Sequence, residues 1–305
     1  MIVAVCIAIS LLLVSTEGAM ATSAVNDNNY AGYTNDVHIN PDVVEVQASW
    51  IVPTLYCNAT PNADVSIWVG MDAGSDYSDT GSADIEQPGI DGRCKDGQPE
   101  WQAVYEMFPA NPVEAGYTSS IYPISSGDFI WARVMAPGPY GTFETEVWEL
   151  LVKDVTKKWE WRTRVTDQQV SEEASQQLGY AYTFHPLQVD ADWIVESPEL
   201  KSLFSASTAQ LAWFSPIRIF DATMRSNGSN DQIGGGTPQP NGVAPVSYSI
   251  QQSGPEEWAY PSAWSSPAPG LPGGPDSEFT VTYGQPAPVV AHKCVTVAGK
   301  SICPG

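Results

Sequence analysis

The stretch VDADWIVESPEL, residues 189–200, decides the fold of this chain. Its Trp-Ile-Val centre favours a pleated, half-buried strand. Side chains alternate between the two faces of a strand, so Asp192, Ile194 and Glu196 share one face. Because a carboxylate is costly to bury without partners, the simplest interpretation of this stretch alone places Glu196 in water at the strand end.

Strand-like runs of this kind recur along the 305 residues, and no helical period or heptad accompanies them. The chain has 25 Gly, 25 Pro, 11 Trp and 13 Tyr, which is typical of many short strands joined by turns. One polar segment, from Thr166 to Gly179, is expected to form a loop or a short surface helix. We therefore predict an all-β protein, an antiparallel two-sheet β-sandwich like the jelly rolls of lectins.

The charge balance restricts the class of partner. The chain has 13 basic and 35 acidic residues, a formal net charge of −22. Nucleic acids and anionic membrane surfaces attract positive charge, so neither is an expected partner. Carboxylate repulsion is relieved as carboxyl groups take up protons, so the composition is compatible with an acidic working environment.

The N-terminus has the features of a secretory signal peptide. The apolar run from Ile2 to Val14 is too short to span a bilayer, and Ala19-Met20-Ala21 fits a cleavage site. We predict a signal peptide over residues 1–21, cleaved between about 21 and 24, and a secreted product with no stable membrane insertion. The main domain is predicted over residues 25–284, followed by an appended tail over 285–305.

The cysteine count favours disulfides rather than a metal site. Four cysteines remain after the signal peptide, and an even number in an exported chain indicates pairing. We favour Cys57 with Cys94, and Cys294 with Cys303, the second pair closing a short tail hairpin. No CxxC spacing occurs, and the three histidines are scattered, so no metal and no cofactor are expected. The histidines are His38, His185 and His292.

The sequence lacks the motifs of the common serine, cysteine and aspartic catalytic sites. No G-x-S-x-G is present for a serine nucleophile, and paired cysteines leave no free thiol. Asp79-Thr80-Gly81 matches half of an aspartic-protease pair, but no second copy occurs and its surroundings indicate a loop. Carboxylates and amides remain as candidate catalytic groups. A buried Gln, such as Gln87 before the Pro88-Gly89 turn, donates to a developing oxyanion, and a buried Glu serves as general base and then acid.

Seven blocks in order along the chain resemble the glutamic peptidase family, the eqolisins. They extend from about Tyr30 to Gly284 and cover most of the mature chain. Each block is weak singly, and their shared order makes the match specific. The blocks are NYAGY, ASWIVPTLYC, IWVGMDAG, IEQPGID, WQAVYEMFPANPV, ADWIVESP and YSIQQSG with SEFTVTYG.

The resemblance implies a secreted acid endopeptidase that acts on proteins and peptides without a covalent intermediate and without sensitivity to pepstatin. Gln87 and Glu196 match the catalytic pair. Glu196 is then expected to activate water as general base and to protonate the leaving amine, while Gln87 donates to the oxyanion and helps position the water. Four further residues match supporting positions around the groove. They are Trp68, Asp72, Asp91 and Glu106.

The chain departs from the family pattern without losing a catalytic side chain. Pro88 follows Gln87 and restricts the backbone of that residue. Val104 replaces a Trp and is expected to open space near the groove. Substrate preference is therefore affected more than activity. Three other departures are Tyr30, Met71 and Asp192.

Two alternatives belong to other functional classes. A non-catalytic β-sandwich that binds carbohydrate or peptide would use exposed aromatic residues such as Trp258 and Trp264, and would not depend on the catalytic pair. A glycosidase using Asp192 and Glu196 is less favoured, because their Cα atoms lie about 13 Å apart at strand rise. The predicted peptidase is expected to be a monomer.

Overall fold

A computed structural model of the chain describes its β-rich body and parts of its tail. The predicted signal peptide, Trp264, Cys294 and Cys303 lie outside the described residues, as does the Asp79-Thr80-Gly81 segment. The predicted domain boundaries therefore remain predictions. The described residues are 24–27, 29–36, 43–73, 84–138, 147–202, 205–226, 229–232, 246–251, 258–262, 277–284, 295–297 and 300–302.

The strands form two antiparallel layers, which confirms the predicted two-sheet sandwich. The first layer follows the order β10-β9-β8-β3-β14-β18, and the second follows β16-β2-β11-β4-β5-β6-β7. In the first layer the bounds are β3 (Val43–Ile51), β8 (Phe129–Met135), β9 (Val147–Asp154), β10 (Trp159–Thr166), β14 (Ile217–Ser226) and β18 (Phe279–Tyr283). In the second they are β2 (Tyr30–Asp36), β4 (Asp64–Met71), β5 (Ile85–Lys95), β6 (Gln98–Phe108), β7 (Val113–Glu114), β11 (Asp190–Glu196) and β16 (Val246–Gln251).

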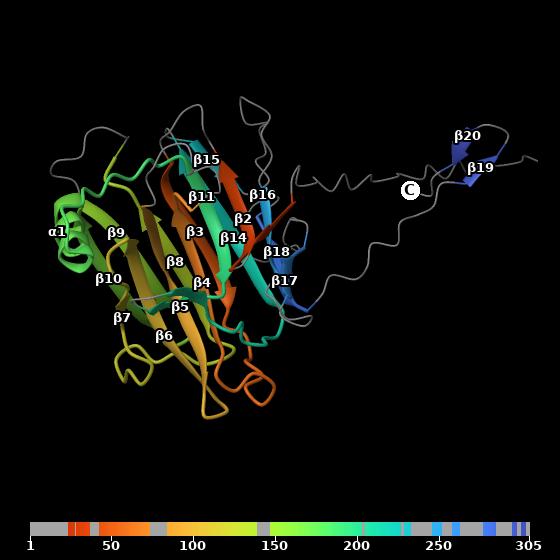
Figure 1. The fold of residues 1–305 in the computed structure, drawn as a ribbon, viewed down its shortest axis with the longest axis horizontal. Coiled ribbons are helices and arrows are strands. Elements are labelled where there is room, and N and C mark those ends of the chain that lie inside the picture. The colour runs from red at the N-terminus through yellow and green to blue at the C-terminus, as the bar shows by residue number, and fades with distance from the viewer. Residues whose placement is uncertain are drawn as a thin grey trace, which may run out of the picture.

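The layers pack face to face and are joined at one edge. Strand β3 contacts β4 and β11 across the core, and β8 contacts β4 and β5 (Figure 1). Strand β17 (Trp258–Pro261) pairs with both β16 and β18 and so links the layers. Two short strands add to the layers: β1 (Ala24–Asp27) on β16 and β15 (Ser229–Gln232) on β14. Two separate two-stranded sheets are formed by β12 (Glu199–Ser202) with β13 (Ser205–Thr208) and by β19 (Val295–Val297) with β20 (Lys300–Ile302).

The polar segment after β10 forms helix α1 (Asp167–Leu178) beside β10 (Figure 1). Thr166 and Gln169 make a capping box at its start, and Gly179 ends it in the left-handed region with φ 75°. Val170 and Ala174 are buried, while most other side chains of α1 are polar and outward. Of the two structures expected for this segment, the helix is the one that forms. No helix among the described residues has the length and apolar character that a membrane crossing needs.

The core between the layers is aromatic and aliphatic. Trp50, Trp148 and Trp193 are fully buried in it. Trp193 also donates from Nε1 to the carbonyl oxygen of Gln47 across the layers, at 3.0 Å. The disulfide between Cys57 and Cys94, with a Cα–Cα distance of 5.2 Å, confirms that predicted pair.

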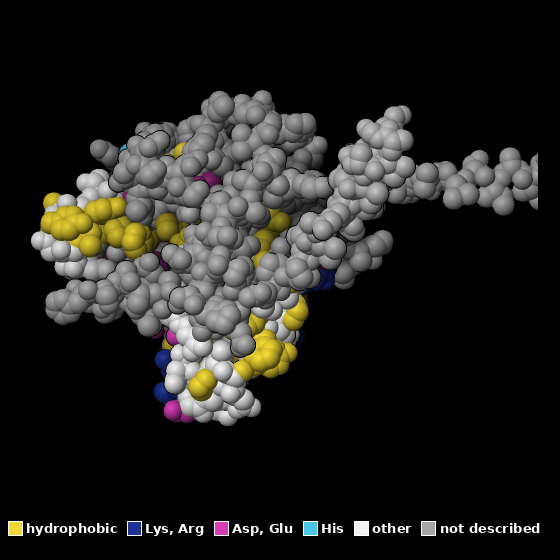
Figure 2. All heavy atoms as spheres, turned by 45° about the vertical axis from the view of Figure 1, so that its right-hand side comes forward, with side chains coloured by type: hydrophobic (Ala, Val, Ile, Leu, Met, Phe, Trp, Pro, Cys, Tyr) yellow, Lys and Arg dark blue, Asp and Glu magenta, His cyan; other side chains and the backbone are white. Residues whose placement is uncertain are grey.

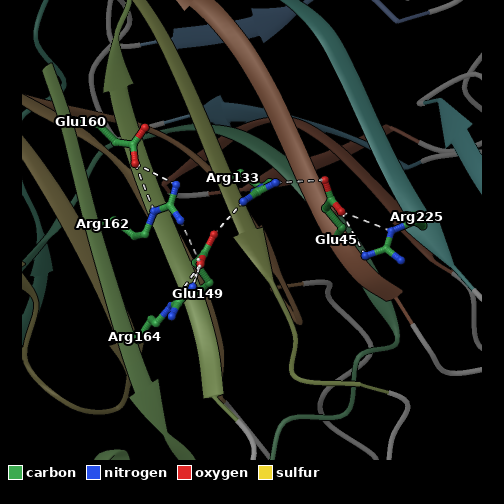
Figure 3. A network of polar contacts seen from close by, with 7 residues as sticks. All are labelled: Glu45, Arg133, Glu149, Glu160, Arg162, Arg164 and Arg225. Atoms are coloured by element: carbon green, nitrogen blue, oxygen red, sulfur yellow. Dashed lines mark hydrogen bonds and ion pairs between the residues drawn. The ribbon is translucent and has the colours of Figure 1, made fainter. Parts of the chain in front are cut away.

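The outer face of the first layer carries a ladder of ion pairs that crosses five strands (Figure 3). Glu149 on β9 accepts from Arg133, Arg162 and Arg164. Arg133 also lies 3.8 Å from Glu45 on β3, which pairs with Arg225 on β14. Glu160 pairs with Arg162 on β10. Apart from the Glu160–Arg162 pair within β10, these ion pairs join neighbouring strands on a face that does not contribute to the core.

Exposed hydrophobic side chains come from separate elements rather than from one of them. Figure 2 shows them in distinct groups, at the left edge and on the lower lobe of the face in view. Tyr180, Trp213 and Ile121 are examples, with exposed fractions of 60%, 45% and 71%. Such scattered residues are normal on a protein surface.

Candidate active site

The predicted catalytic residues lie on the outer face of the second layer. Glu196 ends β11, which pairs with β4, and β4 pairs with β5. A cross-strand row runs from Glu196 to Ser66, to Asp91 and to Gln102 on β6. Gln87 lies further along β5, opposite Glu106. Side-chain alternation therefore brings residues from four strands to one surface.

These residues line a groove with a volume of about 370 Å³. Five of the six predicted site residues contribute to it: Trp68, Gln87, Asp91, Glu106 and Glu196. The other lining residues are Asn29, Tyr30, Ser66, Ile85, Val104, Phe108, Pro112 and Pro198. The groove therefore brings both predicted catalytic side chains to one concave surface, the usual setting of a ligand site.

Glu196 is not the solvated strand end that its own stretch suggests. Its Oε2 accepts from Trp68 Nε1 at 2.7 Å, and its Oε1 accepts from Asn29 Nδ2 at 3.4 Å. Burial raises the pKa of Glu196 to about 8, and the negative charges of Glu106 and Asp91 add to that rise. The donor groups of Trp68 and Asn29 oppose it. The carboxyl group is thus held in place and keeps its proton into the neutral range.

Gln87 is oriented by a carboxylate. Its Nε2 donates to Glu106 Oε2 at 2.8 Å. The amide nitrogen is the donor in this bond, so the nitrogen end of the amide, and not its oxygen, faces Glu106. Gln87 Oε1 is buried and has no hydrogen-bond partner among the described residues. Because Gln87 lines the groove, the amide hydrogen that is not donated to Glu106 is the group that it can offer to a water or a substrate.

Trp68 lies over β5 because Gly89 leaves room for it. A Cβ atom at position 89 would lie 2.6 Å from the Cβ of Trp68 and 2.3 Å from the carbonyl oxygen of Ile67. Tyr30 packs edge-on against the Trp68 ring, with centroids 5.6 Å apart and an interplanar angle of 80°. The indole that holds Glu196 is thus fixed from two sides.

Asp91 belongs to the groove but is already hydrogen-bonded within it. Its Oδ1 accepts from Ser66 Oγ at 2.5 Å and its Oδ2 from Gln102 Nε2 at 3.4 Å. Burial raises its pKa to about 7, against the effect of these donors. Asp91 is therefore protonated in the acid range and supports the groove as a neutral group.

Asp72 lies away from the groove, unlike the other supporting residues. It is buried, with φ 67°, and follows β4 directly. Its carboxylate accepts from the backbone N–H groups of Leu187, Gln188 and Val189 at 2.7–2.8 Å. Those residues lead into β11, so Asp72 fixes the approach to the strand that carries Glu196.

Sequence reasoning missed Asn29 and Ser66, which touch Glu196 and Asp91. Signals for both exist in the sequence. Ser66 lies two residues before Trp68, on the same strand face, and Asn29 opens the NYAGY block. No group of His, Cys, Asp and Glu among the described residues is arranged to hold a metal ion.

Comparison with known proteins places this geometry in a family. The sequence model described as the Peptidase A4 family matches residues 28–238, more than half of the chain. This chain belongs to the Peptidase A4 family. The match spans Gln87 and Glu196 and all the groove strands of the second layer. A search of curated protein sequences finds no match.

Two solved structures of peptidases share the fold of this chain. Scytalido-glutamic peptidase, solved with a peptide based transition state analog, is 18% identical with a TM-score of 0.55. SCP-B, a member of the Eqolisin family solved with the tripeptide Ala-Ile-His, is 18% identical with a TM-score of 0.52. Each comparison covers 85% of this chain and 100% of the other. Family and fold together support a peptidase.

Proposed function

We propose that this Peptidase A4 protein is a secreted acid endopeptidase in which Glu196 and Gln87 act on a water molecule, with no covalent intermediate. The observation that carries the proposal is the groove that both side chains line, together with the hydrogen bonds that fix each of them. Its substrates are proteins and peptides, in agreement with the peptide ligands of the two structural neighbours.

The protonation state of Glu196 determines how the reaction starts. Because the pKa of Glu196 is raised to about 8, the carboxyl group holds its proton at acid pH. Activity in that range requires a neutral Glu196 that acts through both oxygens. Its hydroxyl donates to the substrate carbonyl oxygen, while its other oxygen accepts a proton from the attacking water.

This step balances and leaves the enzyme unchanged. The water oxygen bonds to the carbonyl carbon, and the C=O π electrons move to the oxygen that takes the Glu196 proton. The product is a neutral gem-diol, and Glu196 is again protonated, on its other oxygen. In the second step Glu196 donates to the amide nitrogen and takes a gem-diol proton as the C–N bond breaks.

Gln87 assists without changing its protonation state. Gln87 lines the groove, and the amide hydrogen that is not donated to Glu106 donates to the developing gem-diol oxygen and helps position the attacking water. An amide is neutral throughout the acid range, so this assistance does not depend on pH. Glu106 acts as a positioning residue, because its carboxylate sets which end of the amide faces the groove.

The test is digestion of casein across pH with pepstatin present, comparing wild type with Gln87→Ala and Glu196→Gln. We expect acid-range cleavage by wild type and losses of about 10²–10⁴-fold in kcat/KM for each variant. Thermal unfolding checks that the variants fold. Cleavage that persists in both folded variants rules out this pair, and a folded wild type inactive at every pH favours a non-catalytic binding protein.

A further inference from the structure

We propose that Asn58 is an N-glycosylation site, and that the first sugar of its glycan packs against the exposed rings of Tyr56 and Trp213. The site goes beyond the proposed peptidase chemistry and rests only on the export that the proposed function includes. Residues 58–60 read Asn-Ala-Thr, the acceptor pattern for an N-linked glycan in an exported chain. A second such pattern, Asn227-Gly228-Ser229, begins outside the described residues.

Asn58 lies in a tight surface turn. The backbone N–H of Ala59 donates to the carbonyl oxygen of Tyr56 at 2.8 Å, and that of Thr60 donates to the same oxygen at 3.4 Å. Asn58 and Ala59 are both exposed. A bulky, hydrated glycan needs a surface turn of this kind, so the folded chain has room for one at Asn58.

Thr60 is the buried member of the pattern, so the glycan is attached before the turn folds. In the folded chain Thr60 is 5% exposed, and its Oγ1 accepts from the backbone N–H of Trp213 at 3.0 Å. Cys57 pairs with Cys94, which follows it by 37 residues. Asn58 therefore enters the secretory pathway before the bond that constrains its turn can form.

The reaction needs one co-reactant, a lipid-linked oligosaccharide diphosphate, and the transferase of a eukaryotic secretory pathway. The side-chain nitrogen of Asn58 bonds to C1 of the first sugar, and the bond between C1 and the diphosphate oxygen breaks. The electron pair of that bond leaves with the lipid diphosphate, the amide loses one proton, and nothing is oxidised or reduced.

Tyr56 and Trp213 form an exposed aromatic surface beside the turn. Their side chains are 44% and 45% exposed, and their ring centroids lie 5.4 Å apart. The backbone N–H of Tyr56 donates to the carbonyl oxygen of Trp213 at 2.7 Å. Tyr283 stacks on the Trp213 ring at 5.9 Å between centroids. The two rings are therefore held side by side by the fold itself.

Attachment at Asn58 favours the glycan over other occupants of this surface. Tyr56 precedes Asn58 by two residues and begins the same turn, so a linked sugar is held next to the ring. One face of a pyranose ring carries C–H groups, and these gain by leaving water for an aromatic face. None of these residues lines the groove, so the glycan is expected to stabilise the fold without changing catalysis.

The first experiment asks whether the glycan is present. The full chain is secreted from a yeast, and its intact mass is measured before and after treatment with peptide N-glycosidase. We expect the treatment to remove a glycan and to convert Asn58 to Asp, which peptide mass spectrometry locates. Asn58→Gln abolishes this modification, whereas Thr60→Ser, which keeps the hydroxyl, and Asn227→Gln retain it.

The second experiment asks where the sugar lies. An endoglycosidase trims the glycan to one N-acetylglucosamine, and urea unfolding compares this form with Asn58→Gln. We expect the trimmed form to have a folding equilibrium constant about fivefold higher. The gain is lost when both forms carry Tyr56→Ala or Trp213→Ala, and it stays when they carry Tyr180→Ala, an exposed ring beyond helix α1.

An exported chain without a glycan on Asn58 overturns the site, and casein digestion by the same preparation decides the peptidase proposal separately. A gain that persists in Tyr56→Ala and Trp213→Ala, or no gain at all, overturns the packing. So does an Asn58→Gln dimer in sedimentation that Trp213→Ala disrupts, because the rings then bind a second copy. If the chain's own N-terminus does not direct export, a yeast leader in place of residues 1–21 does so. The export part of the proposed function then fails, and the glycan result still decides the site.

Discussion

At the scale of single residues, the pKa of Glu196 reflects a balance between burial of its carboxyl group and the hydrogen bonds that this group accepts. Burial raises that pKa, and the indole N–H of Trp68 lowers it. A donor to a carboxylate stabilises the charged form. The Trp68 hydrogen bond therefore sets the pH above which Glu196 loses the proton that the proposed reaction needs.

Trp68→Phe is accordingly expected to extend activity to higher pH. The variant keeps an aromatic ring against Tyr30 but loses the donor to Glu196, so the pKa of Glu196 rises further. The measurement is kcat/KM against pH, in which the alkaline limb moves upward. Trp213→Phe, outside the groove, serves as control. An alkaline limb that stays in place or moves to lower pH contradicts this account.

Residue-level sequence reasoning selected five residues that the structure brings to one groove, but it did not predict all of the geometry around them. Glu196 was assigned to the groove through the ordered blocks, whereas its own stretch indicated a solvated strand end. The difference arises because Trp68 and Asn29 reach Glu196 from positions 128 and 167 residues away. Asp72 was predicted to lie around the groove, yet its carboxyl group accepts hydrogen bonds from backbone N–H groups such as that of Gln188, away from the groove. Such partners depend on tertiary contacts that no local pattern contains.

At the scale of elements, the disulfide joins the segment before β4 to the end of β5. Cys94 N also donates to the carbonyl oxygen of Ala63 at 2.8 Å, directly before β4 begins. Strands β4 and β5 carry Trp68 and Gln87 respectively, so this link stabilises the register that brings the two together.

Replacing both cysteines, Cys57→Ala with Cys94→Ala, is expected to lower the free energy of unfolding by about 4 kcal/mol. The bond closes a loop with a sequence separation of 37, and its removal frees that loop in the unfolded chain. Urea unfolding of wild type and the double variant measures the change, and wild type with a reductant gives an independent value. A loss below about 1 kcal/mol by both routes would show that the loop is constrained by other contacts.

Most strands could be predicted from the sequence, because the alternation of apolar and polar residues and the positions of turn residues are local features. Runs such as DVSIWVGM form strands as expected, since alternate residues from Val65 to Met71 face the core. The residues between them, such as Ser66 and Trp68, face the groove. The segment from Thr166 to Gly179 was left open between loop and helix. Its helix depends on a capping box and on two buried residues, Val170 and Ala174, that contact the body.

At the scale of the whole molecule, two groups of carboxylates respond to acid in opposite ways. Burial acts to raise the pKa of Glu149, but hydrogen bonds from Arg164 and Arg133 and the charge of Arg162 outweigh it, so its pKa is lowered. Its stabilising contribution is present above its usual pKa and is lost as pH falls through the folded value. Glu149, at the centre of the ladder in Figure 3, therefore stays ionised to lower pH than an ordinary Glu.

Glu86 responds in the other direction. It is fully buried beside Gln87, on the opposite face of β5, and neither of its oxygens has a hydrogen-bond partner among the described residues. Burial raises its pKa well above 4.5, and the carboxylates of Asp72, Asp84, Asp167 and Asp190 raise it further. The folded protein thus binds this proton at pH values where the unfolded chain releases it, so stability is full below pH 4.5 and falls as pH rises.

Glu86→Gln is expected to remove this part of the pH dependence. The amide has the shape of the protonated carboxyl group but cannot ionise, so stability near pH 5 changes little and stability near neutral pH rises. At pH values above 4.5 and below the raised pKa of folded Glu86, the fall of unfolding free energy with pH should become less steep by about 1.4 kcal/mol per pH unit. Urea unfolding at several pH values measures it. Glu173→Gln, on the exposed side of α1, provides the matched control. An unchanged slope in Glu86→Gln would mean that other buried carboxyl groups, such as Asp91, determine stability at neutral pH.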